Sequence, residues 1–180
     1  PTGTRWRRLL FAVRSGAAAL RLSPVITAES RVLLRRTILE RVQALAPFLS
    51  FDADPYLVVN DDGRLVWLLD AYTVTDHFPY SRPVRTNLSP SGSANYVRNS
   101  VKVVVDAFDG RPTYYVVDDA DPLVAAWRGA FPSLFRPAAE MPAGLRVHWR
   151  YPEGLFRLQA EVYTRYHITD ATEFYNANDV

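Results

Sequence analysis

The chain has 180 residues, of which 48% are hydrophobic and 22% are charged, so it can bury a core and is not disordered as a whole. It contains no cysteine, which excludes a disulfide scaffold, a thiolate metal site and a cysteine nucleophile. No stretch approaches the roughly 20 consecutive apolar residues of a membrane-spanning helix. The first residue is not methionine and no signal-peptide pattern follows, so we expect a soluble fragment of a longer protein.

Charge is distributed unevenly along the chain. Residues 1–51 carry nine arginines and two glutamates, a balance of +7, whereas residues 52–180 carry twelve basic and seventeen acidic groups, a balance of −5. The simplest interpretation is that cationic N-terminal helices pack on an acidic body or face solvent. The alternative is an anionic partner, either lipid headgroups or a cell-wall polymer, contacted by Arg31 and Arg35. Nucleic acid is not expected, because the basic charge is nearly all arginine and no aromatic and basic sheet motif is present.

Two helices are predicted in the N-terminal part. Apolar residues at helical spacing predict an amphipathic helix over residues 5–20, with Gly16 weakening its middle. A second helix is predicted to begin after Thr27, a good N-cap, and to end before Pro47. The first helix either borders a core or lies on a membrane surface, where it would bind anionic vesicles less tightly as salt rises. The membrane contact would use Trp6, Arg5, Arg7 and Arg8.

The middle of the chain predicts two β-hairpins. Residues 56–59 and 65–69 are apolar runs around the turn-forming tetrapeptide 60–63. Residues 97–107 alternate between apolar and polar side chains and, after a turn at 108–110, lead into 113–117. Between the hairpins, residues 75–94 are rich in proline, serine and glycine and predict a long loop.

Helix signals return after residue 120. Asp121 followed by Pro122 predicts a helix start, and Pro152 opens another helix. Residues 131–144 contain three prolines and predict a surface connection, while Asp170 with Glu173 resembles a capping box for a last short helix. We therefore predict that residues 1–180 form one α+β domain, or part of one, with an antiparallel sheet of about four strands packed with N-terminal and C-terminal helices. Its parts are a helical arm at 1–50, the sheet at 51–120 and a helical region at 121–180.

Signatures of metal sites and of catalysis are weak in this sequence. The histidines at 77, 148 and 167 lie far apart in sequence and form no metal motif, and no nucleophile elbow or phosphate-binding glycine loop is present. We expect no cofactor. Clustered aspartates at Asp118, Asp119 and Asp121 could bind calcium, but aspartates at such positions also cap turns and helices.

Two functional hypotheses follow. The first is a non-enzymatic module in which the long loop holds a ligand between Phe78 and Tyr80, with Asn99 as a further contact. The second is a cell-envelope hydrolase or transferase acting on glycan or lipid, with a carboxylate as general acid or base. The candidate carboxylates flank the long loop and the second hairpin: Asp70, Asp76, Asp106 and Asp109.

Several runs of the sequence are similar to a known family. They are Ile26 to Arg31, Ala46 to Leu49, Asp54 to Tyr56, Trp67 to Thr73, Asn95 to Gly110 (NYVRNSVKVVVDAFDG) and Tyr151 to Phe156. In order and over nearly the whole chain, the sequence resembles uncharacterised protein family 0182.

That family consists of large bacterial membrane proteins with several spanning helices followed by a long soluble region. The resemblance implies that this chain is part of the soluble region and faces the extracytoplasmic side of the cell membrane. It implies no activity, cofactor or catalytic residue. It favours ligand binding, partner binding or assembly with the remainder of a membrane-embedded parent chain.

Overall fold

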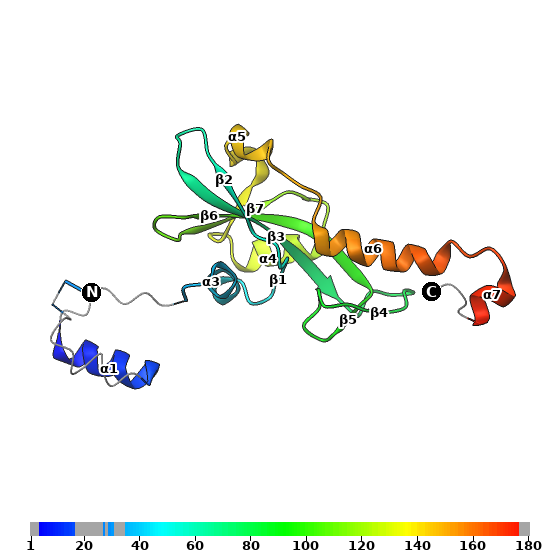
Figure 1. The fold of residues 1–180 in the computed structure, drawn as a ribbon, viewed down its shortest axis with the longest axis horizontal. Helices are drawn as coiled ribbons and strands as arrows, with labels where there is room; N and C mark the ends of the chain where they lie inside the picture. Colours follow the sequence, from blue (N-terminus) through cyan, green and yellow to red (C-terminus); the bar gives the residue numbers. More distant parts are fainter. Residues whose placement is uncertain (1–3, 17–26, 28, 31–34, 177–180) are drawn as a thin grey trace. The chain divides into compact units, whose positions relative to one another are not determined.

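The computed structural model describes residues 4–16, 27, 29–30 and 35–176 (Figure 1). Contacts divide the chain into two units, Pro1–Arg36 and Thr37–Val180. In the described part of both units, no helix is both long enough and apolar enough to cross a membrane.

The first unit contains α1 (Arg5–Ser15). The side chain of Thr4 caps the helix by accepting a hydrogen bond from the Arg7 amide at 3.3 Å. The helix ends at Gly16, which has a φ of 64° and is the C-cap rather than the weak middle of a longer helix. The prediction of a helix continuing past Gly16 was therefore wrong, and residues 17–20 lie outside the described residues.

The second predicted helix begins later than expected. Helix α3 (Ile38–Leu45) starts after Thr37, whose hydroxyl accepts from the Glu40 amide at 3.3 Å. Its end before Pro47 is confirmed. A helix starting directly after Thr27 is wrong, because the described residues Glu29 and Ser30 are not helical, and Arg35, with a φ of 52°, separates this region from α3. Residues 28 and 31–34 lie outside the described residues. Thr37 and Glu40 also match a capping pattern, and it is this second signal that the fold uses.

A six-stranded sheet forms the centre of the second unit, and its order is β1-β3-β6-β7-β8, with β2 also paired to β3 (Figure 1). Every pairing is antiparallel except that of β7 with β8. Both predicted hairpins are confirmed, as β2–β3 and β6–β7. The strands are β1 (Ser50–Phe51), β2 (Tyr56–Val59), β3 (Leu65–Thr75), β6 (Tyr96–Asp106), β7 (Pro112–Val116) and β8 (Phe135–Pro137). The predicted long loop contains a separate two-stranded sheet of β4 (Val84–Arg85) and β5 (Ser93–Ala94).

Both faces of the central sheet are covered. On one face, Leu69 and Val103 pack with Val42 of α3 and Val124 of α4 (Pro122–Ala130). On the other face, strand residues pack with residues of the segment that contains α5 (Ala143–Arg146): the cluster is Tyr56, Val58, Val66, Leu68, Val104, Tyr115, Met141 and Leu145. The alternation in β6 predicted one buried face, but Lys102 on the second face is buried as well.

The segment 131–144 is not only a surface connection. It supplies β8, a 3₁₀ turn at Ala138–Glu140 and the start of α5. Phe135 and Met141 between the prolines are buried, as is Leu145 just after Pro142, and these apolar residues complete the core. Prolines are compatible with this arrangement because β8 is a short edge strand, where a missing amide donor costs little.

Two further helices complete the second unit. Helix α6 (Glu153–Tyr166) begins directly after Pro152, and α7 (Ala171–Asn176) follows Asp170, whose carboxylate accepts from the Thr172 and Glu173 amides. These starts confirm the predictions, as does the start of α4 after Asp121. Helix α6 runs alongside the β4–β5 pair in Figure 1, and residues of both line the same hollows.

Gly110 in the β6–β7 turn should be sensitive to substitution. Its φ is 71°, and a Cβ at this position would lie 2.0 Å from a guanidinium nitrogen of Arg41, which donates to the Gly110 carbonyl at 3.0 Å. Gly110→Ala is expected to lower the free energy of unfolding in urea by about 2 kcal/mol, from backbone strain and the displaced arginine. Gly63→Ala is the matched control, because φ is 74° there and nothing lies within 4 Å. Equal losses in the two variants would show that the Arg41 contact contributes nothing.

Candidate functional site

The start of α6 is fixed by a residue far away in sequence. Pro152 offers no side-chain cap, and the amide of Gly154 instead donates to the Asp52 carboxylate at 3.0 Å. The same carboxylate accepts from the hydroxyl of Tyr72, and Asp52 itself is buried. Burial, and then the hydrogen bond to Asp52, raise the pKa of Tyr72 well above its usual range, so this tyrosine stays a donor. The contact anchors the first turn of the helix on the sheet.

Further along, α6 forms one wall of a groove. The opposite wall comes from β4, β5 and the beginning of β6, and the hollow has a volume of about 580 Å³. A second hollow of about 330 Å³ continues around β4 toward α7. The two hollows share Arg82, Val84, Leu158, Val162 and Tyr166, and we call them together the α6 groove.

Apolar and aromatic side chains dominate the α6 groove. Leu158 and Val162 are only half-buried, and Tyr163 and Tyr166 are 71% and 69% exposed. These side chains occupy successive turns of α6, so they form a continuous apolar stripe. An exposed stripe of this kind, lining a hollow, is typical of a surface that binds another apolar segment.

The rim of the α6 groove carries positive charge. Arg82 and Arg85 line the second hollow together with Glu161, two cations against one anion. Among the described residues, neither arginine side chain has an ion-pair or hydrogen-bond partner. The rim can therefore accept carboxylates from whatever occupies the groove.

A larger hollow of about 780 Å³ lies near the start of α6 and is polar. Its wall includes Asp54, Glu153 and Glu161, but also Arg85 and Arg157, and Arg157 pairs with Glu153. Across the described part of the chain, no three histidine, aspartate or glutamate side chains are grouped closely enough to hold a metal ion. Mixed charge gives this hollow no clear preference for a cation or an anion.

The residues predicted to hold a ligand are only partly brought together. Phe78 stacks on Tyr96, a residue of the groove wall, with ring centroids 5.2 Å apart. Tyr80 is fully exposed and has a φ of 58°, so it does not form a wall with Phe78. Asn99 lies elsewhere, donating to the Ala71 carbonyl at 3.2 Å. Of these three residues, only Phe78 contacts the groove wall, and neither Tyr80 nor Asn99 is among the residues that line the groove.

The predicted carboxylates do not share a cleft. Asp70 is buried in an ion pair with Lys102, and Asp76 lies beyond the end of β3, where it pairs with His77 at 2.5 Å. Asp106 lies opposite Val66 in the β3–β6 pair. Val66 is four residues before Asp70 on β3, so Asp106 and Asp70 are separated by about 13 Å along the strand direction.

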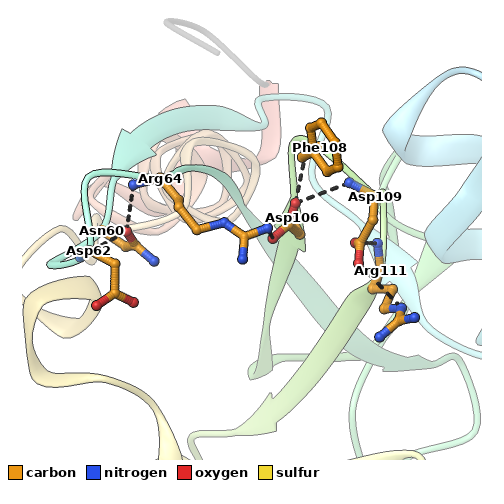
Figure 2. Close-up of polar contacts among 7 residues, drawn as sticks. All are labelled: Asn60, Asp62, Arg64, Asp106, Phe108, Asp109 and Arg111. Carbon is orange, nitrogen blue, oxygen red and sulfur yellow. Dashed lines mark hydrogen bonds and ion pairs between the residues drawn. The ribbon is translucent and has the colours of Figure 1, made fainter.

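Asp106 is the last residue of β6 and lies between the turns of the two hairpins (Figure 2). It pairs with Arg64 at 2.7 Å, and hydrogen bonds from the amides of Asp109 and Phe108 lower its pKa. Asp109 pairs in turn with Arg111 at 3.3 Å. This arrangement joins the two turns, and it keeps Asp106 ionised rather than available as a general acid.

The three clustered aspartates have structural partners, and the two arginines do not form a row on a helix. Asp118 pairs with Arg98 at 3.2 Å and Asp119 with Arg128 at 2.5 Å, while Asp121 caps α4. Arg35 lies outside any helix, and Arg31 lies outside the described residues, so the structure does not show the predicted arginine row.

The fold and the site together define an α+β protein whose exposed groove is apolar. The chain belongs to the uncharacterised protein family UPF0182, whose model matches residues 1–180. It is similar to a UPF0182 protein of Methanospirillum hungatei, with 51% identity over 96% of this chain and 19% of that protein. A UPF0182 protein of Moorella thermoacetica is 49% identical over 99% of the chain and 19% of its own length.

The chain thus spans about a fifth of the length of these curated relatives. No solved structure matches the chain.

Proposed function

We propose that this chain is a non-enzymatic binding module of a longer protein, and that the α6 groove binds another segment of the same parent chain. The observation that carries the proposal is the incomplete cover of α6. Its apolar stripe lines two hollows instead of a closed core, although the first turn of the helix is anchored on the sheet.

The length of the relatives supports an occupant from the parent chain. Relatives about five times as long as this chain offer many segments that could lie on the groove. The expected segment is apolar in its centre, to cover Leu158 and Val162, and acidic at its end, to meet Arg82 and Arg85. Covering exposed tyrosines while pairing arginines combines the two most common anchors of protein interfaces.

As a further part of this proposal, the parent is embedded in a membrane and the module faces the extracytoplasmic side. The resemblance to the family's architecture supports this part. Anionic lipid or a cell-wall polymer on the arginine rim is the competing occupant, and the experiment separates it from a protein segment.

The test places a photo-reactive benzoylphenylalanine at Tyr163 in the full-length parent protein. Irradiation is expected to give a cross-link within the same chain, mapped by mass spectrometry to an apolar segment with acidic residues beside it. The matched control carries the probe at Val147, which is exposed but lies outside the groove, and should give no such product. A cross-link from Tyr163 only to lipid, only to a separate protein, or to nothing would overturn the proposal.

A further inference from the structure

Strand β2 leaves one edge of the central sheet open. Among the described residues it pairs with β3 alone, and its four residues, Tyr56 to Val59, contain neither proline nor a charged side chain. Natural edge strands are usually protected by such residues, because free amides and carbonyls can pair with another strand. An unprotected apolar edge is thus a surface on which a further strand can be added.

The hydrogen-bond pattern between β2 and β3 shows which backbone groups of β2 do not bond to β3. Asn60 bonds to Arg64 across the hairpin, whereas Leu65 bonds to Ala107 on the opposite side of β3. Antiparallel pairs alternate between bonded and non-bonded, so Val59 opposite Leu65, and Leu57 opposite Trp67, do not bond to β3. Their amides and carbonyls point away from the sheet, and none is bonded to another described residue.

The side chains beside this edge are apolar and exposed. Leu57 and Val59 are 45% and 55% exposed, and their neighbour Leu65 on the same face is 48% exposed. The face opposite is buried, with Tyr56 and Val58 in the core. An added strand would therefore satisfy the outward backbone groups and cover Leu57 and Val59 with alternate apolar residues of its own.

Negative charge marks both ends of the edge. Asp54 precedes β2, and Asp61 and Asp62 follow it, and among the described residues none of the three forms an ion pair. Arg64 in the same turn is paired with Asp106, as Figure 2 shows. Arg150 stacks on the Tyr56 ring, 4.2 Å from its centre. The acidic ends are thus not neutralised by these two cations.

We propose that the β2 edge binds an extended segment as an added strand, apolar at alternate positions and flanked by lysine or arginine. Charge complementarity selects the basic flanks, and the outward groups of Leu57 and Val59 select an extended backbone. A second copy of this chain fits poorly. Antiparallel pairing of Leu57 with Val59 of the other copy would bring Asp54 of each copy toward Asp62 of the other.

The test uses the 180-residue chain and two fluorescent peptides, KKVTITVKK and EEVTITVEE, which differ only in the charge of their ends. Fluorescence anisotropy at low salt is expected to show that the basic peptide binds about fivefold or more tightly than the acidic one. The double variant Asp61→Lys, Asp62→Lys should reverse this preference. Hydrogen exchange measured by NMR should show that the basic peptide slows exchange at the amides of Leu57 and Val59.

A pair of variants separates backbone pairing from side-chain contact. Leu57→Pro removes an outward amide without removing a bond to β3 and is expected to weaken peptide binding at least about tenfold. Leu57→Thr keeps the amide and should stay within about threefold of the unaltered chain. Equal binding of the two peptides, no protection at Leu57 and Val59, or dimers of the chain that Leu57→Pro abolishes would each overturn the proposal. If Leu57→Pro does not fold, the charge reversal decides.

Discussion

Replacing Lys102 with methionine is expected to lower the free energy of unfolding by about 3–5 kcal/mol. The side chains of Lys102 and Asp70 are only 5% and 6% exposed and pair with each other. The lysine also donates to the Arg150 carbonyl at 3.1 Å. Methionine fills a similar volume but leaves a buried carboxylate without its cation. Urea denaturation monitored by circular dichroism measures the loss.

The loss in Lys102→Met should depend on pH. Burial raises the pKa of Asp70, and the ammonium group of Lys102 opposes part of that rise. Without the lysine, the folded pKa of Asp70 rises further above the unfolded value of about 3.9. A raised carboxyl pKa favours the fold below the unfolded pKa, and this advantage disappears as pH rises through the folded pKa. The free energy of unfolding of the variant should therefore be closest to that of the unaltered protein near pH 4, and the difference should be largest at neutral pH.

A double variant provides the control. Asp70→Leu with Lys102→Met removes both charges, so it is expected to recover most of the lost stability. A double variant no more stable than Lys102→Met would mean that packing around the pair, rather than the unpaired charge, explains the loss.

Replacing Asp121 with alanine is expected to lower the free energy of unfolding by about 3–4 kcal/mol. The buried carboxylate accepts from the hydroxyls of Ser100, Thr73 and Tyr96 and from the Leu123 amide. Alanine removes the cap of α4 and leaves buried hydroxyls without an acceptor. Chemical denaturation at neutral pH measures the effect.

Acid should weaken the unaltered protein through the same carboxylate. Burial alone would raise the pKa of Asp121, but hydrogen bonds from Ser100, Thr73, Tyr96 and Leu123 outweigh it and lower the pKa. A lowered pKa contributes stability above the unfolded value of about 3.9 and loses it as pH falls through the folded value. Between pH 5 and about pH 2, the Asp121→Ala variant should therefore lose less stability than the unaltered protein does.

Asp119→Ala is the comparison for this prediction, because that carboxylate is 71% exposed and, among the described residues, pairs with Arg128 alone. We expect it to change stability by less than about 1 kcal/mol. If Asp121→Ala showed the same acid slope as the unaltered protein, the Asp121 cluster would not be the source of the acid sensitivity.

Local signals in the sequence predicted much of the fold. The turn at 60–63 and the alternation over 97–107 gave both hairpins, and Asp121 followed by Pro122 gave the start of α4. Each of these signals acts over a few residues, through a turn conformation, a pleat or a cap. Such signals do not depend on the rest of the structure, and the α+β class followed from their order.

Elements that depend on distant partners were missed. Strand β8 has three residues, the last of which is Pro137, and only the adjacent β7 shows that they extend the sheet. The burial of Lys102 was missed for the same reason, because the alternation along β6 does not reveal that helices cover both faces.

The candidate site could be predicted only in part. The sequence predicted that a helix begins after Pro152, but not that Leu158, Val162 and Tyr166 of this helix line a groove. The groove arises because Asp52, about a hundred residues earlier, fixes the first turn of α6 while nothing described closes over the exposed tyrosines. Neither contact has a signature in the local pattern.

The register between β3 and β6 shifts between Ala71 and Thr73. Near this shift, Ser100 donates to Asp121 at the start of α4, and the next residue, Val101, packs in the cluster that contains Val124 of the same helix.

Two polar clusters, one around Lys102 and one around Asp121, therefore lie close together along the same strand pair. Sliding β6 by one residue would move Lys102 to the face that packs against Val124 and would leave the buried Asp70 without its cation, so mispaired intermediates are strongly penalised. The register of β3 and β6 is thus determined by side chains of the two strands themselves. Changes in the length of the connecting segment at 86–92 should leave this register unaltered.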